Sequence, residues 1–144
     1  MKNLIISLLL GSCLVLTGCK TPTAQAILTN APVIISVTVP PTVSIGVQKQ
    51  PKAIPYLKDL VTVINTFALG QDLSPDTLAA TIKSSKIKEL QTPEALNVAN
   101  ALVVLYKTYY NTAVTNKIAS VENLVPILQA LSNAITQGLP TVTP

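Results

Sequence analysis

Histidine, arginine and tryptophan are absent from this sequence, and all ten basic residues are lysines. Without histidine, the chain lacks the side chain that most often transfers protons at neutral pH, which disfavours general acid–base catalysis. Without arginine, a nucleic-acid-binding function is disfavoured as well. Charged residues make up 11 % of the chain, against about 25 % in ordinary soluble domains. The hydrophobic share of 49 % excludes a disordered tail, and 144 residues leave room for one small domain.

The six acidic residues are spread along the chain and form no pair or cluster typical of a catalytic site. Asp76 and Glu94 each follow a hydroxyl–proline pair, a position where the helix dipole stabilises a negative charge. The segment that starts at Asp72 resembles the opening of a calcium loop, but Thr77 and Lys83 stand where that loop needs Gly and Glu. The sequence therefore predicts no catalytic, cofactor-binding or metal-binding residue, and a protein that is not an enzyme.

The N-terminal segment is typical of an export signal. Lys2 is followed by an apolar run over residues 4–16, which is shorter than the roughly 20 residues that a membrane-spanning helix needs. The run ends in Leu16-Thr17-Gly18-Cys19, an aliphatic residue, two small residues and a cysteine. The chain is therefore expected to be exported.

These four residues resemble the lipobox of bacterial lipoproteins. The resemblance covers residues 1–19 and implies cleavage before Cys19, which then carries diacylglycerol on its thiol and a third acyl chain, such as palmitate, on its amine. Two acyl chains already suffice for stable anchoring in a membrane. Cys13 leaves with the signal peptide, so the mature chain has no free thiol for a disulfide or a metal site. Lys20, in place of aspartate, implies sorting to the outer membrane where the host is Gram-negative.

The tether that follows Cys19 has a β-like pattern. Residues 33–39 and 42–47 are rich in β-branched side chains that alternate with others, and Pro40-Pro41 separates the two segments. We expect extended or weakly β segments here. A competing interpretation is a short helix over about residues 41–50, with Val43 and Val47 one turn apart. The prolines argue against a membrane-spanning helix, because they would leave backbone groups unpaired in lipid.

From about residue 52 onward, apolar residues recur at helical spacing in four segments. The first segment ends at Gly70. Ser74-Pro75-Asp76 and Thr92-Pro93-Glu94 open the second and third, since each supplies a hydroxyl N-cap, a proline at the first helical position and an acid. The sequence thus predicts an all-α bundle of about four helices that folds on its own.

The fourth segment covers about residues 123–137 and is expected to stop at Gly138. Pro126 fits the first turn of this helix only if Asn123 is the N-cap, whereas a start at Ser120 would place the proline in the helix interior and kink it.

Together these patterns divide the chain into a signal peptide over residues 1–18, a lipid anchor and tether over 19–50, a helical domain over 51–138 and a loose tail over 139–144.

Three of the four tyrosines, Tyr106, Tyr109 and Tyr110, lie on one face of the third predicted helix. One interpretation places them at the edge of the core, with their hydroxyls reaching water. The other makes them a contact patch, because aromatic side chains with a polar tip dominate binding hot spots. The spacing leaves both open.

Taken together, the residues predict a non-catalytic lipoprotein that is exported and anchored in the membrane through the lipid on Cys19. We expect it to bind a protein partner in the cell envelope and no nucleic acid, and to require no cofactor. The chain also resembles small lipoproteins of phages and prophages, which implies a role in excluding a second phage. The alternative is a structural or assembly-accessory lipoprotein. In a Gram-negative host, it would lie on the outer membrane and face the periplasm or the cell surface.

Lys83, Lys86 and Lys88 form a small basic cluster, which Glu89 partly offsets. Such a cluster indicates at most a weak attraction to anionic lipid headgroups.

Overall fold

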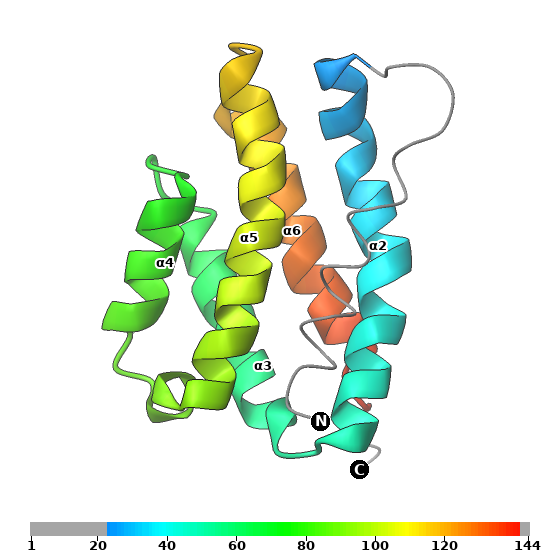
Figure 1. Ribbon diagram of the computed structural model, residues 1–144, viewed down its shortest axis with the longest axis vertical. Coiled ribbons are helices and arrows are strands. Elements are labelled where there is room, and N and C mark those ends of the chain that lie inside the picture. Colours follow the sequence, from blue (N-terminus) through cyan, green and yellow to red (C-terminus); the bar gives the residue numbers. More distant parts are fainter. Residues whose placement is uncertain (1–22, 142–144) are drawn as a thin grey trace.

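Five α-helices and one short 3-10 helix form residues 23–141, the part of the chain that the computed structural model describes. In chain order they are α2 (Ala24–Lys49), α3 (Ala53–Phe67), α4 (Pro75–Ser84), η2 (Lys88–Gln91), α5 (Pro93–Thr115) and α6 (Val121–Gly138) (Figure 1). Residues 23–141 contain no strand. The prediction of an all-α bundle is confirmed, with five α-helices in place of about four.

Helix α6 contacts α2, α3 and α5, whereas α3 and α5 each contact all the other described α-helices and η2. Helix α2 lies along α6 for much of its length, and α4 packs on the outer side of α5 (Figure 1). The short helix η2 connects α4 to α5 and contacts both of them as well as α3. One continuous apolar core fills the space between these helices, and its largest fully buried side chains include Ile35, Leu60, Tyr106, Ile127, Leu128 and Ile135.

The expectation of extended or β segments over residues 33–47 is wrong, since this stretch lies within α2. The buried positions of α2 recur every three or four residues, which is a helical period: Leu28, Ala31, Ile35, Val39, Thr42, Val43, Gly46 and Val47. Tertiary packing of this face outweighs the β preference of its valines and isoleucines. The alternative of a short helix over about residues 41–50 describes only the C-terminal half of α2.

Three prolines lie inside α2, at positions 32, 40 and 41. Each lacks the N–H that would bond to the preceding turn, so the backbone hydrogen bonding of α2 is weakened at these positions and its core contacts matter more for its stability. The hydroxyl of Thr23 caps the helix by accepting a hydrogen bond from the backbone N–H of Ala26 (3.3 Å). Within the helix, the hydroxyls of Ser36, Thr38 and Thr42 donate to carbonyls three or four residues earlier.

The expected boundary at residue 50 therefore does not separate a tether from a helical domain. Helix α2 supplies core side chains, and its extensive contact with α6 makes it part of the bundle. Within the described chain, the helical domain starts at Ala24. At the other end, Leu139 is half-buried against the core, and residues 142–144 of the expected tail lie outside the described residues.

The two predicted helix starts are confirmed. The hydroxyl of Ser74 accepts a hydrogen bond from the N–H of Thr77 (3.2 Å), and the hydroxyl of Thr92 accepts one from the N–H of Ala95 (3.3 Å). Proline occupies the start of both helices. Local sequence is sufficient to predict these helix starts, because N-capping involves only residues within one turn of each other.

The start of α6 differs from the preferred expectation. Ser120 is the N-cap residue, so Pro126 lies in the helix interior and not in the first turn. The side chain of Asn123 does not cap the helix and instead donates to the carbonyl of Ile118 (2.7 Å). Gly138 is the last residue of α6 and is buried, and its φ, like that of Gly70, is not positive. These two glycines therefore do not end their helices through the left-handed conformation.

Candidate functional site

The lipidation residue predicted from the sequence, Cys19, lies outside the described residues, as does the signal peptide over residues 1–18. The described chain starts at Thr23, and α2 starts at Ala24, five residues after Cys19. A chain of five residues spans at most about 18 Å even when fully extended. Any lipid on Cys19 would therefore hold the first turn of α2 close to the membrane surface.

The three tyrosines of α5 are not an exposed patch. Tyr106 is fully buried, and its hydroxyl donates a hydrogen bond to the carbonyl oxygen of Leu73 (2.7 Å). Tyr109 is also buried, while Tyr110 is half-buried with its ring centroid 6.2 Å from that of Tyr106. The contact-patch interpretation is therefore wrong for Tyr106 and Tyr109, which are core residues.

The environment of Tyr106 keeps its hydroxyl protonated. Burial removes water from around the phenol and raises the pKa far above its ordinary value of 10.0, and Tyr110 and Asp72 add to the rise. Because the charged form is so disfavoured, this hydroxyl acts as a hydrogen-bond donor that joins α5 to the loop before α4.

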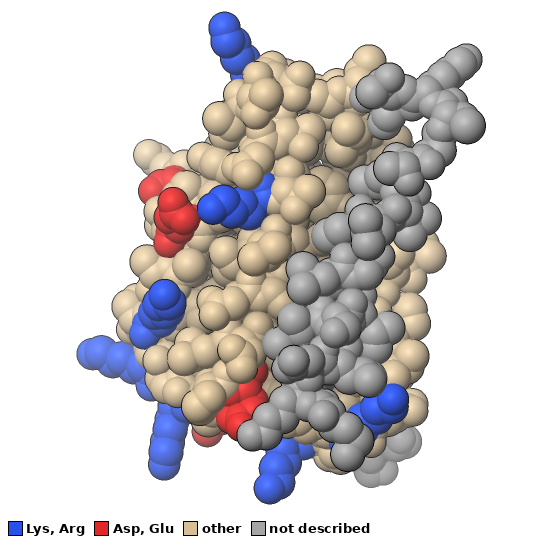
Figure 2. All heavy atoms as spheres, viewed as in Figure 1, with Lys and Arg blue, Asp and Glu red and all other residues tan. Residues whose placement is uncertain are grey.

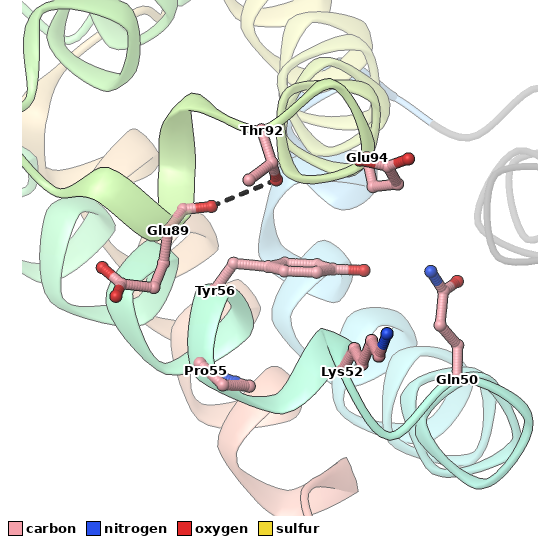
Figure 3. A pocket seen from close by; sticks show the side chains of 7 residues that line it. All are labelled: Gln50, Lys52, Pro55, Tyr56, Glu89, Thr92 and Glu94. Carbon is pink, nitrogen blue, oxygen red and sulfur yellow. Dashed lines mark hydrogen bonds between the residues drawn. The ribbon is translucent and has the colours of Figure 1, made fainter.

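A pocket of about 480 Å³ lies where the connection between α2 and α3 meets η2 and the start of α5 (Figure 3). Gln50 and Lys52 line it from the connection, and Pro55 and Tyr56 line it from the first turn of α3. The remaining lining comes from Glu89, Thr92 and Glu94. Its volume is within the range of small-ligand sites.

Tyr56 forms the wall of this pocket. Its side chain is only 6 % exposed, yet its hydroxyl end points into the open space between Glu94 and Lys52, with Gln50 beyond (Figure 3). This hydroxyl makes no hydrogen bond within the described chain and is accessible to solvent, because no buried side-chain nitrogen or oxygen of the described residues lacks a partner. Burial raises the pKa of Tyr56, and the negative charge of Glu94 raises it further.

The charged side chains around Tyr56 are also unpaired. Lys52, Glu89 and Glu94 form no ion pair with one another or with any other described residue. Thr92, by contrast, is engaged, since its hydroxyl donates to the carbonyl of Glu89 (3.3 Å) and caps α5 (Figure 3). The residues that line the pocket thus include one phenol, one ammonium group and two carboxylates, and the carboxylate of Glu89 points away from the Tyr56 hydroxyl (Figure 3).

Sequence reasoning missed this pocket. The sequence predicts that the Glu94 carboxylate is stabilised by the helix dipole, and Glu94 does lie in the first turn of α5. Lys52 and Glu94 are far apart in the sequence and are brought together only by the packing of η2 and α5 against α3. The one available signal was Tyr56, the tyrosine that lies apart from the α5 group.

A second surface feature is a row of exposed apolar residues along α2. Val33 and Val37 are 63 % and 68 % exposed, Ile45 is 40 % exposed, and Pro41 is exposed between them. These residues are four apart and lie along one side of the helix. Helix α2 carries no charge before Lys49, and Figure 2 shows few charged side chains on this view of the molecule, mostly at its edges. By length and composition α2 could cross a membrane, although its opposite face packs in the core.

No group of three or more His, Cys, Asp or Glu residues that could hold a metal occurs among residues 23–141. Comparison with family models, curated proteins and solved structures finds no match to this chain.

Proposed function

We propose that this protein is a non-catalytic lipoprotein, anchored through Cys19, that binds another component of the cell envelope. The observation that carries the proposal is the motif Leu16-Thr17-Gly18-Cys19 at the end of a short, lysine-led apolar run. Acylation of Cys19 places the bundle against the membrane, because the linker to α2 is so short.

The absence of histidine from the chain supports a binding role over a catalytic one. Binding at the cell surface or in the periplasm is also what a phage-exclusion protein does when it blocks a receptor or the entry of DNA. The resemblance to small phage and prophage lipoproteins favours this role, and Lys20 favours the outer membrane in a Gram-negative host.

A structural or assembly-accessory role is the second candidate, and the exposed side of α2 favours it. Val33, Val37 and Ile45 present apolar surface on a helix that starts next to the anchor. An uncharged helix with apolar side chains on its outer side is suited to lie against lipid. In this arrangement α2 would fix the orientation of the bundle on the membrane.

Metabolic labelling with a palmitate analogue tests the anchor. Cys19→Ser should abolish labelling and leave the uncleaved precursor, because the acceptor thiol is lost. Cys13→Ser is the matched control, since Cys13 lies in the same segment, and it should label and mature normally. Label retained by Cys19→Ser would contradict the proposal.

Photocrosslinking separates the two candidate roles. A photoreactive residue is placed at Val37 on the exposed side of α2, and in a second protein at Gln129, which is exposed on α6. Lipid adducts at position 37 but not at 129 would support packing against the membrane. Protein adducts at position 37 would support a protein partner on this surface.

A further inference from the structure

Three helix ends meet at one end of the bundle: α2 starts there, α5 ends there and α6 starts there (Figure 1). The side-chain amide of Gln25, in the first turn of α2, donates a hydrogen bond to the side-chain oxygen of Asn123, in the first turn of α6 (3.4 Å). The start of α2 therefore lies directly beside the start of α6. We call this end, residues 23–27 and 113–124, the anchor end, because it begins four residues after Cys19.

The anchor end exposes apolar side chains and carries little charge. Val114, in the last turn of α5, is 48 % exposed, and Val121, the first residue of α6, is 54 % exposed. The charged residues of the anchor end are Lys117 and Glu122, which have opposite signs. Most lysines of the described chain lie toward the opposite end, where α2 and α4 end and η2 starts (Figure 2). The anchor end is thus the less charged end of the bundle.

The loop between α5 and α6 holds Lys117 in a left-handed backbone conformation, with a φ of 57°, where glycine is the usual residue. The N–H of Lys117 donates to the carbonyl of Val114 (3.0 Å), and the N–H of Ile118 donates to the carbonyl of Ala113 (2.9 Å). These two bonds form a Schellman motif that fixes the turn. The Lys117 side chain is exposed and forms no ion pair within the described chain. A lysine in this position can extend its ammonium to a lipid phosphate while its methylene groups lie along apolar surface.

We infer that the anchor end is a lipid-contacting surface on which the bundle stands upright. Val114 and Val121 contact the membrane, and the ammonium of Lys117 lies among the lipid phosphates. This inference rests on the proposed function, because acylation of Cys19 is what holds the anchor end at the membrane. The exposed valines offer little apolar surface by themselves, but a tether this short gives them a high effective concentration at the lipid surface.

An upright bundle keeps the long sides of its helices away from lipid. Val37 is thirteen residues after the start of α2, and Val104 is eleven residues before the end of α5. At 1.5 Å per residue they lie about 20 Å and about 16 Å along their helices from the anchor end. The exposed row on α2 is then open to a protein partner. If α2 lay flat on the membrane instead, Val37 would be in the lipid contact.

Tryptophan fluorescence in vesicles is the test, because the chain contains no tryptophan of its own. Val121→Trp, Val104→Trp and Val37→Trp each introduce one reporter at an exposed valine, so the three full-length proteins are matched. Each is labelled in cells with the palmitate analogue and reconstituted into vesicles of phosphatidylcholine and phosphatidylglycerol, with or without brominated acyl chains. Bromine quenches tryptophan only at short range. We expect brominated lipid to reduce emission at position 121 and to leave emission at 104 and 37 unchanged.

A second set of variants tests Lys117. In the Val121→Trp protein, Lys117→Gln should weaken quenching in vesicles that contain phosphatidylglycerol, because an attraction to the anionic surface is lost. Lys107→Gln is the matched control, since Lys107 is an exposed lysine of α5 away from the anchor end. An equal effect of both substitutions, or of neither, would exclude the role of Lys117.

Circular dichroism establishes that each variant is folded, and Val114→Trp is the second reporter of the anchor end if Val121→Trp fails to fold. Palmitate label without quenching at the anchor end would overturn the inference and leave the anchor at Cys19 intact. Quenching at 37 or 104 equal to or stronger than at 121 would also overturn it. Loss of both label and quenching would overturn both proposals. Quenching at 121 without label would support the lipid contact and contradict acylation of Cys19.

Discussion

Gly138 at the end of α6 lies directly against Val43 of α2. A Cβ atom built on Gly138 would lie 2.5 Å from the Cβ of Val43 and 2.6 Å from the carbonyl oxygen of Pro40. Real Cβ contacts are essentially never shorter than 3.0 Å, so no side chain fits at this position without moving a helix. Glycine is therefore required here by the close approach of α2 and α6, and not by a turn.

The first prediction is that Gly138→Ala destabilises the protein. If helix propensity alone acted at this position, alanine would stabilise α6 by at most about 0.8–1.0 kcal/mol, the difference found in a helix interior, because Gly138 is the last residue of the helix. The contact with Val43 opposes this, and separating the two helices should lower the free energy of unfolding by about 1–3 kcal/mol. Denaturant unfolding measures the difference, and the sign of the change decides between the two effects.

Gln137→Ala is the control for Gly138→Ala. Gln137 is the preceding residue of the same helix and is exposed, so its substitution should change the free energy of unfolding by no more than about 0.5 kcal/mol. A stabilising effect of Gly138→Ala would show that α2 and α6 are farther apart than described.

The second prediction concerns the buried hydrogen bond of Tyr106. Tyr106→Phe removes the donor to the carbonyl of Leu73 and leaves a buried acceptor without its partner. The free energy of unfolding should fall by about 1–3 kcal/mol. Tyr110→Phe, on the same helix, should change it by no more than about 0.5 kcal/mol, because the Tyr110 hydroxyl makes no hydrogen bond within the described chain.

A pH dependence accompanies this hydrogen bond. Burial raises the pKa of Tyr106 in the folded protein above 10.0, so above about pH 10 the unfolded chain loses this proton first. The stabilising contribution is therefore fully present below pH 10 and is lost as the pH rises beyond it. Unfolding measured across this range should show a steeper alkaline decline in the unaltered protein than in Tyr106→Phe. Equal slopes would mean that Tyr106 ionises normally.

The third prediction concerns Asp72 in the loop before α4. Its carboxylate accepts from the hydroxyl of Thr77 (2.6 Å) and from the N–H of Ser74 (3.0 Å), and these bonds lower its pKa below 3.8. A lowered pKa means that the stabilisation is present above pH 3.8 and is lost as the pH falls through the folded value. Asp72→Asn should therefore be less stable than the unaltered protein at neutral pH, and the difference should vanish in acid.

Thermal unfolding of both proteins across the acid range tests this expectation. Asp59→Asn is the control, because Asp59 accepts no hydrogen bond within residues 23–141. A difference between Asp72→Asn and the unaltered protein that persists unchanged at low pH would contradict the assignment.

The sequence was informative where structure depends on neighbouring residues. The caps at Ser74 and Thr92 were predictable because a hydroxyl, a proline and an acid act within one turn. Helix α2 was not predictable from its own sequence, because Ile35 and Val39 have a β preference and prolines interrupt the segment. The helical period of its buried face results from its packing against α6.

The candidate sites likewise differ in whether they depend on neighbouring residues or on tertiary packing. Spacing placed Tyr106 and Tyr109 on one face of a helix, but whether that face is buried depends on the loop that carries Leu73. The pocket could not be predicted, because Lys52 and Glu94 line the same pocket only when η2 and α5 are packed on α3. Sequence alone provides the lipid-anchor prediction at Cys19, a residue outside the described chain.

The fourth prediction is that residues 51–138 do not fold without α2. This reverses the sequence-based expectation of a self-contained domain. Removing α2 deletes five buried aliphatic side chains, each worth about 1.5–3 kcal/mol: Leu28, Ile35, Val39, Val43 and Val47. Their combined loss is comparable with the entire stability of an ordinary domain, about 5–15 kcal/mol, and it also exposes the side of α6 that α2 covers. Circular dichroism should show that a fragment of residues 23–141 is helical and unfolds cooperatively, whereas residues 51–138 should lose both properties. A cooperative, helical fragment of residues 51–138 would show that α2 lies on the domain without being part of its core.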